Sequence, residues 1–428
     1  MRALALFSGG CDSLISMKLL TMQGIEVIAL HFNIGFGSNK DKREYLRNAS
    51  AQAGARLEVV DIREQFFNEI LFAPKYGYGK YFNPCIDCHA NMFANAFYLL
   101  EKFGASFVVS GEVLGQRPKS QRKEALDQVR SLVREVGKKA VFDKILDRSG
   151  GDKNKPQNLD ELLLRPMSAK LLPPSFPEKA GWIDREKLLD ISGRGRTRQL
   201  EMVQKWGWKY YENPGGGCLL TDVSVAKKLK DLSNHRKMGL QDSTIVKIGR
   251  YMVLPNGARA IIGRNESENA KLDMPNPAME KIILLESIGP LGLVEKDASK
   301  EDKILAARIT LGYAKGAKSY EKNTQSQDAS LELMQQTKQN KQSQEVDFGF
   351  FGVARKSQKN IESSLEKTES YLKQTKSCLT QTKTDLEQAQ FDLAQTQNPQ
   401  PQKVQVGNQI YEILPYPKEK AHKFLLLQ

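Results

Sequence analysis

Short apolar runs alternate with amphipathic stretches along the first quarter of the chain. Runs of strand length occupy residues 4–7, 25–32, 57–62 and 107–110, and helical periodicity occupies residues 14–22, 41–53 and 88–103. This alternation is typical of an α/β fold with a doubly wound, mostly parallel sheet. We therefore predict an α/β domain over residues 1–222, followed by a helical connector over residues 223–239.

The pattern changes after the connector. Strand-like runs at 244–254, 258–263, 282–286 and 291–295 and a helical run at 303–313 predict a small α+β domain over residues 240–317. Residues 318–402 are rich in Gln, Lys, Ser and Thr, which predicts a low-complexity insertion, disordered or transiently helical. A strand pattern resumes in residues 403–428, and we predict that this segment completes the small domain.

Composition narrows the class of protein. The 428 residues carry a formal net charge of +14, which indicates either a polyanionic partner such as nucleic acid or a solvated lysine-rich surface. The sequence has no run of about 18 apolar residues that would predict a membrane span. The N-terminus lacks a signal-peptide pattern, and five cysteines do not suggest a secreted disulfide framework. We therefore expect a cytoplasmic protein.

The turn after the first apolar run has the composition of an anion site. Its sequence is Ser8-Gly9-Gly10-Cys11-Asp12-Ser13, between a predicted strand and a predicted helix. Glycines let successive backbone N–H groups point inward, and a helix N-terminus adds partial positive charge, so the turn suits a phosphate. The alternative is an ordinary glycine turn that leads into a helix.

Three cysteines lie in segments that favour chemistry. Cys85 and Cys88 form a Cys-x-x-Cys pair after Asn83-Pro84, a spacing that suits zinc, redox chemistry or an iron–sulfur cluster. Cys218 follows three glycines, which allow close approach of the backbone, although a buried structural cysteine is the alternative. Three thiols could hold a [4Fe–4S] cluster with one open iron, or carry and resolve a persulfide. Cys11 and Cys378 are predicted to take no part.

Four motifs resemble those of known enzymes. Ser-Gly-Gly-x-Asp-Ser resembles the PP-loop of the ATP pyrophosphatase superfamily, whose fold is that of the adenine nucleotide alpha hydrolases. Asn83-Pro84-Cys85-x-x-Cys88 is similar to the segment around the first catalytic cysteine of tRNA 2-thiouridylases. The string from Ser110 to Gln116 looks like the matching segment of tRNA 4-thiouridine synthases, and Leu164-Arg165-Pro166-Met167 resembles an element that both families share.

The resemblance implies a tRNA-thiolating enzyme that uses ATP and Mg²⁺. Such an enzyme adenylates a uridine carbonyl oxygen with loss of pyrophosphate, and sulfur then displaces AMP. Sulfur would come from a donor such as a cysteine desulfurase or free sulfide. By resemblance, the ATP phosphates would be held by Ser8, Gly9, Gly10 and Ser13, and Asp12 would support the loop or Mg²⁺. The nucleotide would also be contacted by Gly111 and Arg165. Sulfur delivery or cluster ligation would fall to Cys85, Cys88 and Cys218.

A second resemblance concerns RNA. Gly263-Arg264-Asn265 with Asn269 resembles the signature of the NFACT-type RNA-binding domain. There Arg264 would pair with a phosphate, and Asn265 and Asn269 would hold the turn or contact a base. The alternative is a polar hairpin. A basic run with Arg194, Arg196 and Arg198 is predicted to add phosphate contacts, with a solvated helix N-terminus as its alternative.

Two other functions stay open from the sequence. One is a PP-loop ligase or amidotransferase with a nitrogen nucleophile, which would have no need of three cysteines. The other is a non-catalytic RNA-binding protein that senses ATP. The sequence also leaves open whether thiolation takes place at the 2- or the 4-position of uridine.

Overall fold

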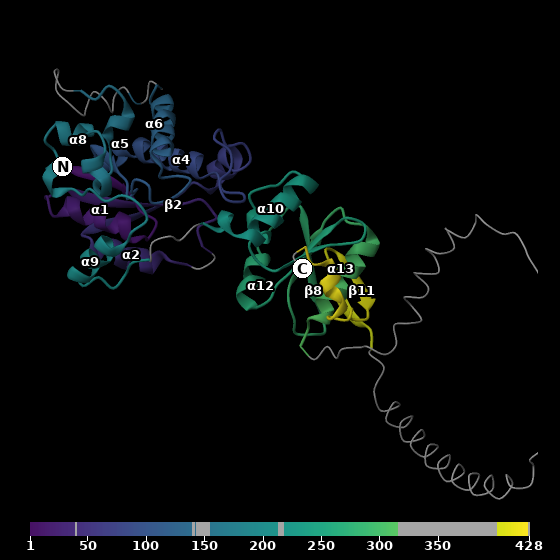
Figure 1. Cartoon of the computed structure of the whole chain (residues 1–428). Helices are drawn as coiled ribbons and strands as arrows, with labels where there is room; N and C mark the ends of the chain where they lie inside the picture. Colours follow the sequence, from purple (N-terminus) through teal and green to yellow (C-terminus); the bar gives the residue numbers. More distant parts are fainter. Residues whose placement is uncertain (39–40, 139–141, 143–154, 213–217, 316–399, 427–428) are drawn as a thin grey trace, which may run out of the picture. The chain divides into compact units, whose positions relative to one another are not determined.

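The computed structural model describes residues 1–38, 41–138, 142, 155–212, 218–315 and 400–426. These residues form two compact units, which divide between Tyr251 and Met252 inside strand β6 (Arg250–Val253). Figure 1 colours the chain along its length and labels most of the elements used below.

The first unit is built on a five-stranded parallel sheet with the order β3-β2-β1-β4-β5. The central strand β1 is buried on both sides, with Ala3, Leu4 and Ala5 at most 1% exposed. The strands are β1 (Arg2–Leu6), β2 (Glu26–Asn33), β3 (Ala55–Asp61), β4 (Phe107–Val109) and β5 (Leu163–Leu164).

Helices cover both faces of this sheet. Figure 1 shows α1, α2 and α9 on one side and α4, α5, α6 and α8 on the other. The strand order reverses direction between β1 and β4, and ligands of open α/β sheets bind at the carboxyl ends of the strands at such a point. The helices are α1 (Cys11–Thr21), α2 (Arg43–Gln52), α3 (Arg63–Gln65), α4 (Cys85–Tyr98), α5 (Leu100–Phe103), α6 (Lys123–Gly137), α8 (Phe176–Lys179), α9 (Thr197–Lys205), α10 (Val223–His235) and α11 (Asp242–Ile245).

The second unit is a six-stranded sheet with the order β11-β10-β8-β9-β7-β6. Helix α13 packs on one face, where Ile282, Val294, Val404 and Ile309 join a common apolar core. Its elements are β6, β7 (Arg259–Ile262), α12 (Glu266–Leu272), β8 (Met279–Leu284), β9 (Gly292–Glu295), α13 (Lys300–Gly312), β10 (Gln402–Val406) and β11 (Gln409–Ile413).

The predicted fold class is confirmed: a parallel α/β domain precedes a separate α+β domain with an antiparallel sheet. One predicted element is wrong, because the strand expected over 244–254 begins as helix α11, and β structure starts only at Arg250. Strand β10 pairs with β8, although more than 110 residues separate them along the chain. Most of the predicted insertion, residues 318–402, lies outside the described residues. None of the described helices is long and apolar enough to cross a membrane.

Candidate active site

The glycine-rich turn lies between β1 and α1, at the carboxyl edge of the sheet. Gly9 adopts a φ of +94°, which favours glycine, and lets the turn fold back over the helix start. Gly10 is the N-cap of α1 and has no side chain to cap the helix, so the first-turn N–H groups are left for another acceptor. Ser8 is exposed beside them, and the Ser13 hydroxyl donates to the Gly10 carbonyl at 2.8 Å. This is the geometry of an anion site.

Gly111, directly after β4, packs against the start of α1. A Cβ atom on Gly111 would lie 2.6 Å from the Cα of Ser13 and 2.9 Å from the carbonyl carbon of Asp12. Only a residue without a side chain fits between the end of β4 and the loop. In this structure the predicted nucleotide contact Gly111 therefore supports the shape of the loop directly.

The Asp12 carboxylate accepts hydrogen bonds from two amides that lie far along the chain. Gln116 donates at 3.0 Å and Gln199 at 3.4 Å, while the Arg196 guanidinium lies 3.6 Å away. Burial raises the pKa of Asp12, and Arg196 and the two amides oppose that effect. Arg196, predicted from the sequence to contact RNA phosphate, thus lies inside the loop site. Gln116 ends one of the motifs named in the sequence analysis but had no assigned role there, and Gln199 was missed.

A buried ion pair lies next to the loop, at the carboxyl ends of β4 and β5. Arg165 Nε donates to Glu112 Oε2 at 2.8 Å, and His89 Nδ1 lies 2.9 Å from Glu112 Oε1. Burial alone would raise the pKa of Glu112, but Arg165 and His89 outweigh it and lower the pKa to about 2. Arg165 Nη2 is buried without a hydrogen-bond partner. Arg165 was predicted from its motif as a nucleotide contact. Glu112 lies within a motif named in the sequence analysis and His89 directly follows another, but neither had an assigned role.

The three predicted cysteines come together from two distant parts of the chain. Cys85 is the first residue of α4, and Cys88 is buried one turn later. Cys218 precedes a 3-10 turn whose Leu219 N–H donates to the Phe36 carbonyl at 2.8 Å, just after β2. Burial raises the pKa of Cys88 well above its ordinary value, and the neighbouring Cys218 and Cys85 raise it further.

Cys85 has the most cationic surroundings of the three thiols. Burial raises its pKa, and Arg117, Asn83 and Lys119 lower it in part. In the described part of the chain, no three His, Cys, Asp or Glu side chains are grouped closely enough to hold a metal ion. The thiols thus do not form a ready-made cluster site, and cluster ligation by the three cysteines stays a prediction.

The segment that ends at Glu212 lies against the loop. Glu212 pairs with Gly10 in a parallel bridge, and its N–H donates to the Gly9 carbonyl at 3.1 Å. The Glu212 side chain forms an ion pair with Lys42, and the Tyr45 hydroxyl donates to the Gly9 carbonyl at 3.3 Å. These contacts attach the chain that leads to Cys218 to the anion site.

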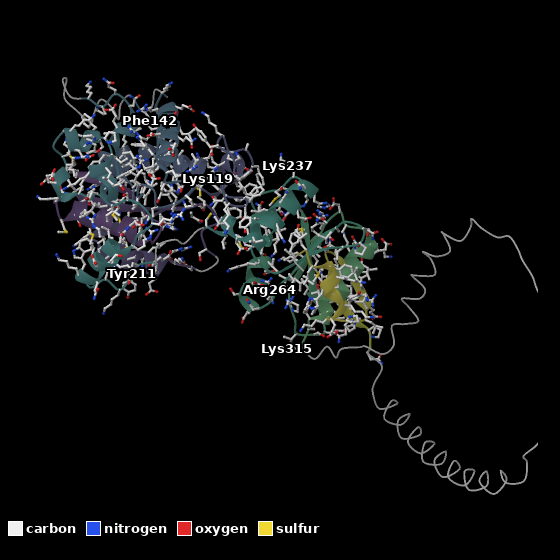
Figure 2. All side chains as sticks on the ribbon, in the orientation of Figure 1. Lys119, Phe142, Tyr211, Lys237, Arg264 and Lys315 are labelled. Carbon is white, nitrogen blue, oxygen red and sulfur yellow. The ribbon has the colours of Figure 1, made fainter. Side chains whose placement is uncertain are left out.

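The predicted RNA-binding residues of the second unit have different surroundings. Asn265 caps α12 by accepting from the Glu268 N–H at 3.0 Å, and Asn269 accepts from the Leu291 N–H at 3.1 Å, so both amides hold the turn. The Arg264 side chain is 51% exposed and lies 3.6 Å from Glu268 (Figure 2). In the first unit, Arg194 is exposed and Arg198 pairs with Asp190 at 2.7 Å.

Comparison with protein families identifies both parts of the chain. Residues 1–133 match the family described as tRNA methyl transferase HUP domain, and residues 249–347 match the NFACT protein RNA binding domain. The two matches agree with the PP-loop and NFACT-type resemblances that the motifs indicated.

Individual relatives match a smaller part of the chain. It is 36% identical over 115 residues to a tRNA-specific 2-thiouridylase from Sulfurimonas denitrificans, which covers 25% of this chain and 33% of the relative. It is 36% identical over 107 residues to a tRNA-specific 2-thiouridylase from Fusobacterium nucleatum, which covers 24% and 31%. The match to a solved structure of a 4-thiouridine synthetase–RNA complex with bound ATP covers 48% of this chain and 50% of the synthetase chain, at 20% sequence identity and a TM-score of 0.28. The chain thus spans about a third of the length of these curated relatives.

Proposed function

We propose that the protein is an ATP-dependent tRNA sulfurtransferase that replaces a uridine carbonyl oxygen with sulfur. One observation carries the proposal: a PP-loop and three cysteines meet at the same edge of the sheet. The loop follows β1, and α4 begins with Cys85 as part of the crossover from β3 to β4. Crossover helices run antiparallel to the strands, which brings their N-termini to the carboxyl edge. Cys218 reaches this edge through Phe36.

The first step activates the uridine. Its carbonyl oxygen attacks the α-phosphorus of ATP and pyrophosphate leaves, so an adenylated uridine forms. The loop amides and the Ser8 hydroxyl would hold the phosphates, and the Ser13 hydroxyl would join them by turning from the Gly10 carbonyl. Mg²⁺ would neutralise part of the phosphate charge. Asp12 supports this geometry through Gln116 and Gln199.

The second step transfers sulfur. The terminal sulfur of a cysteine persulfide attacks the activated carbon and AMP leaves. A second thiolate then attacks the inner persulfide sulfur, so sulfur stays on uridine and a disulfide forms between the two cysteines. The persulfide can be renewed in two ways. A cellular thiol reduces that disulfide and a cysteine desulfurase then transfers persulfide sulfur to the free thiolate, or free sulfide attacks the disulfide directly, which gives one persulfide and one thiolate. This route needs two of the three thiols Cys85, Cys88 and Cys218, one as the persulfide carrier and one as the resolving thiolate. It does not require the ready-made cluster site that the described residues lack.

Support for tRNA as the acceptor comes from two sources. The curated relatives named above are tRNA-specific 2-thiouridylases, and the second unit matches an RNA-binding domain. A net charge of +14 suits a polyanionic substrate. We place the reaction in the cytoplasm, where tRNA, ATP and reducing thiols are available.

Mass spectrometry of tRNA nucleosides from a deletion strain tests the proposal. We expect one thiouridine to disappear and to return with the wild-type gene, and its chromatographic identity separates 2- from 4-thiouridine. If every thiouridine persists at its normal level, the thiolation function is wrong. A nitrogen-nucleophile enzyme would instead show loss of a different nucleoside, and an ATP-sensing binding protein would show no loss.

A further inference from the structure

An aromatic hollow lies where α1, α2 and α9 end in the first unit, and none of the candidate cysteines lines it. Trp206, Trp208 and Tyr210 line a recess of about 480 Å³ that is open to solvent, together with residues from α1 and α2. The two indole rings lie 4.9 Å apart at 41°, and Tyr210 is 42% exposed. Large aromatic groups at a surface commonly mark a binding site, since their burial in the core would be more favourable.

The hollow is built and held in place by neighbouring elements. Helix α9 ends at Trp206, whose N–H donates to Met202, and the following segment is fixed by Gln52 of α2. Gln52 Oε1 accepts from the Lys209 N–H at 3.3 Å and from the Tyr210 N–H at 3.2 Å. A pinned backbone holds the aromatic side chains in place before any ligand arrives, which lowers the entropic cost of binding.

Charge around the hollow favours a nucleotide bound through its base. The lining includes residues from the last turns of α1 and α2 and Trp206, the C-cap of α9, and helix C-termini carry partial negative charge. A phosphate inside the recess is therefore disfavoured, whereas the N–H donors of a base are suited to it. Lys18 and Lys209 also line the hollow and can neutralise a backbone phosphate beside it.

The hollow leads directly to the PP-loop. Two residues beyond Tyr210, Glu212 pairs with Gly10 of the loop. Tyr210 also packs edge-on against Tyr45, whose hydroxyl contacts Gly9. Figure 2 shows Tyr211, between these two, on the side of the unit where Figure 1 places α2 and α9. An extended ligand bound along residues 206–212 would therefore reach the anion site.

We propose that this hollow binds an unpaired nucleotide of single-stranded RNA, by stacking its base on Trp206 and Trp208 while Lys18 and Lys209 face its phosphates. Stacking on aromatic rings is tolerant of sequence, because every base has a π-face. The site would hold a nucleotide next to the one that reacts. That the strand belongs to a tRNA rests on the proposed function, whereas the stacking site itself does not.

The test measures RNA binding by the full-length protein. The probe is a fluorescently labelled, eight-residue single-stranded RNA, compared with a duplex of the same length. In Trp208→Leu, which keeps apolar volume but loses the ring, we expect affinity for the single strand to fall about 5- to 150-fold. Affinity for the duplex should stay unchanged, because its bases are already stacked. Trp208→Phe should retain most of the affinity, and Tyr98→Leu, a matched loss of an exposed aromatic ring elsewhere, should have no effect.

Salt dependence separates the base from the phosphate contacts. Lys209→Gln should lower the slope of log affinity against log salt by about one, whereas Trp208→Leu should leave the slope unchanged. Equal single-strand affinity in Trp208→Leu and the wild type would overturn the inference, and so would an equal loss for strand and duplex. If Trp208→Leu does not fold, tryptophan fluorescence of the wild type and of Trp208→Phe decides. The single strand should quench the wild type more strongly than Trp208→Phe, and a wild-type fluorescence that RNA fails to quench would overturn the inference. Unchanged nucleosides in the deletion strain would remove the proposed function without affecting these results.

Discussion

A Cβ atom on Gly111 would lie 2.5 Å from the backbone nitrogen of Ser13. The end of β4 thus touches the first turn of α1, where the anion site is formed. Because Ser13 and Asp12 are held from this side, a change at Gly111 acts on the loop backbone and leaves the loop's own sequence intact.

We therefore expect Gly111→Ala to weaken ATP binding by about 5- to 150-fold, the equivalent of an overpacking cost of about 1–3 kcal/mol. Isothermal titration calorimetry with ATP measures it. Gly37→Ala is the matched control, because a Cβ at Gly37 meets nothing within 4 Å. Unchanged ATP affinity in Gly111→Ala would show that the loop adapts at no cost.

The Glu112–Arg165 pair predicts how stability depends on pH. The pKa of Glu112 in the folded state is about 2, below its ordinary value of 4.5. The stabilisation, about 3 kcal/mol, is therefore fully present above pH 4.5 and is lost as the pH falls toward 2. Urea unfolding of the first unit between pH 3 and pH 7 measures it.

Glu112→Gln supplies the comparison for that experiment. The variant cannot ionise, so it should be less stable than the wild type at pH 7, and the difference should narrow on acidification. Arg165 stays buried in the variant and loses its charged partner, which adds to the cost at neutral pH. A stability difference that is constant across the range would show that Glu112 titrates normally in the folded protein.

Local sequence patterns predicted the elements whose determinants are close together in the chain. The strand, turn and helix around Gly9 follow from an apolar run and glycine chemistry, and they form as expected. The strand expected to begin at Thr244 failed, because Asp242 sits in the first turn of α11, where it accepts hydrogen bonds from Arg236 and Gly239. The hydrogen bonds of the Asp242 side chain thus favour a helical turn here, despite the apolar Ile245 and Val246 that suggested a strand.

The partners of the site residues depend on the tertiary fold. Asp12 receives Gln116 and Gln199, which are 104 and 187 positions away, and no local pattern indicates either contact. Arg196 lies in a basic run that looks like a phosphate-binding surface, yet it faces Asp12. His89 directly follows the cysteine pair, so a polar residue on the same helix turn was a signal that could have found it.

The cysteines are expected to act in sulfur transfer without contributing to adenylation. Among separate Cys85→Ser, Cys88→Ser and Cys218→Ser variants, the two that remove the persulfide carrier and the resolving thiol should lose thiouridine formation yet still release pyrophosphate from ATP when given tRNA. Cys378→Ser, outside the described residues, is the control and should retain both. Quantitative nucleoside analysis and a pyrophosphate assay measure the two steps. Anaerobic purification with iron analysis completes the test, since stoichiometric iron that all three substitutions abolish would replace the persulfide route by a cluster.

In the second unit, two substitutions distinguish a side chain that contacts RNA from one that holds the fold. Arg264→Ala should leave the free energy of unfolding nearly unchanged, because its ion pair with Glu268 is exposed. It should weaken tRNA binding and lower the salt slope by about one. Asn269→Ala should instead cost about 1–3 kcal/mol of stability, since the Leu291 N–H loses its acceptor.

Arg264→Lys distinguishes charge from geometry in the same assay. A lysine retains the charge but cannot form a bidentate contact with phosphate, so partial recovery of affinity with the full salt slope would indicate a simple charge contact. If Arg264→Ala binds tRNA with wild-type affinity at low salt, Arg264 does not touch RNA. The exposed guanidinium beside α12 would then serve only its pair with Glu268, and the RNA contacts of this unit would have to come from other side chains.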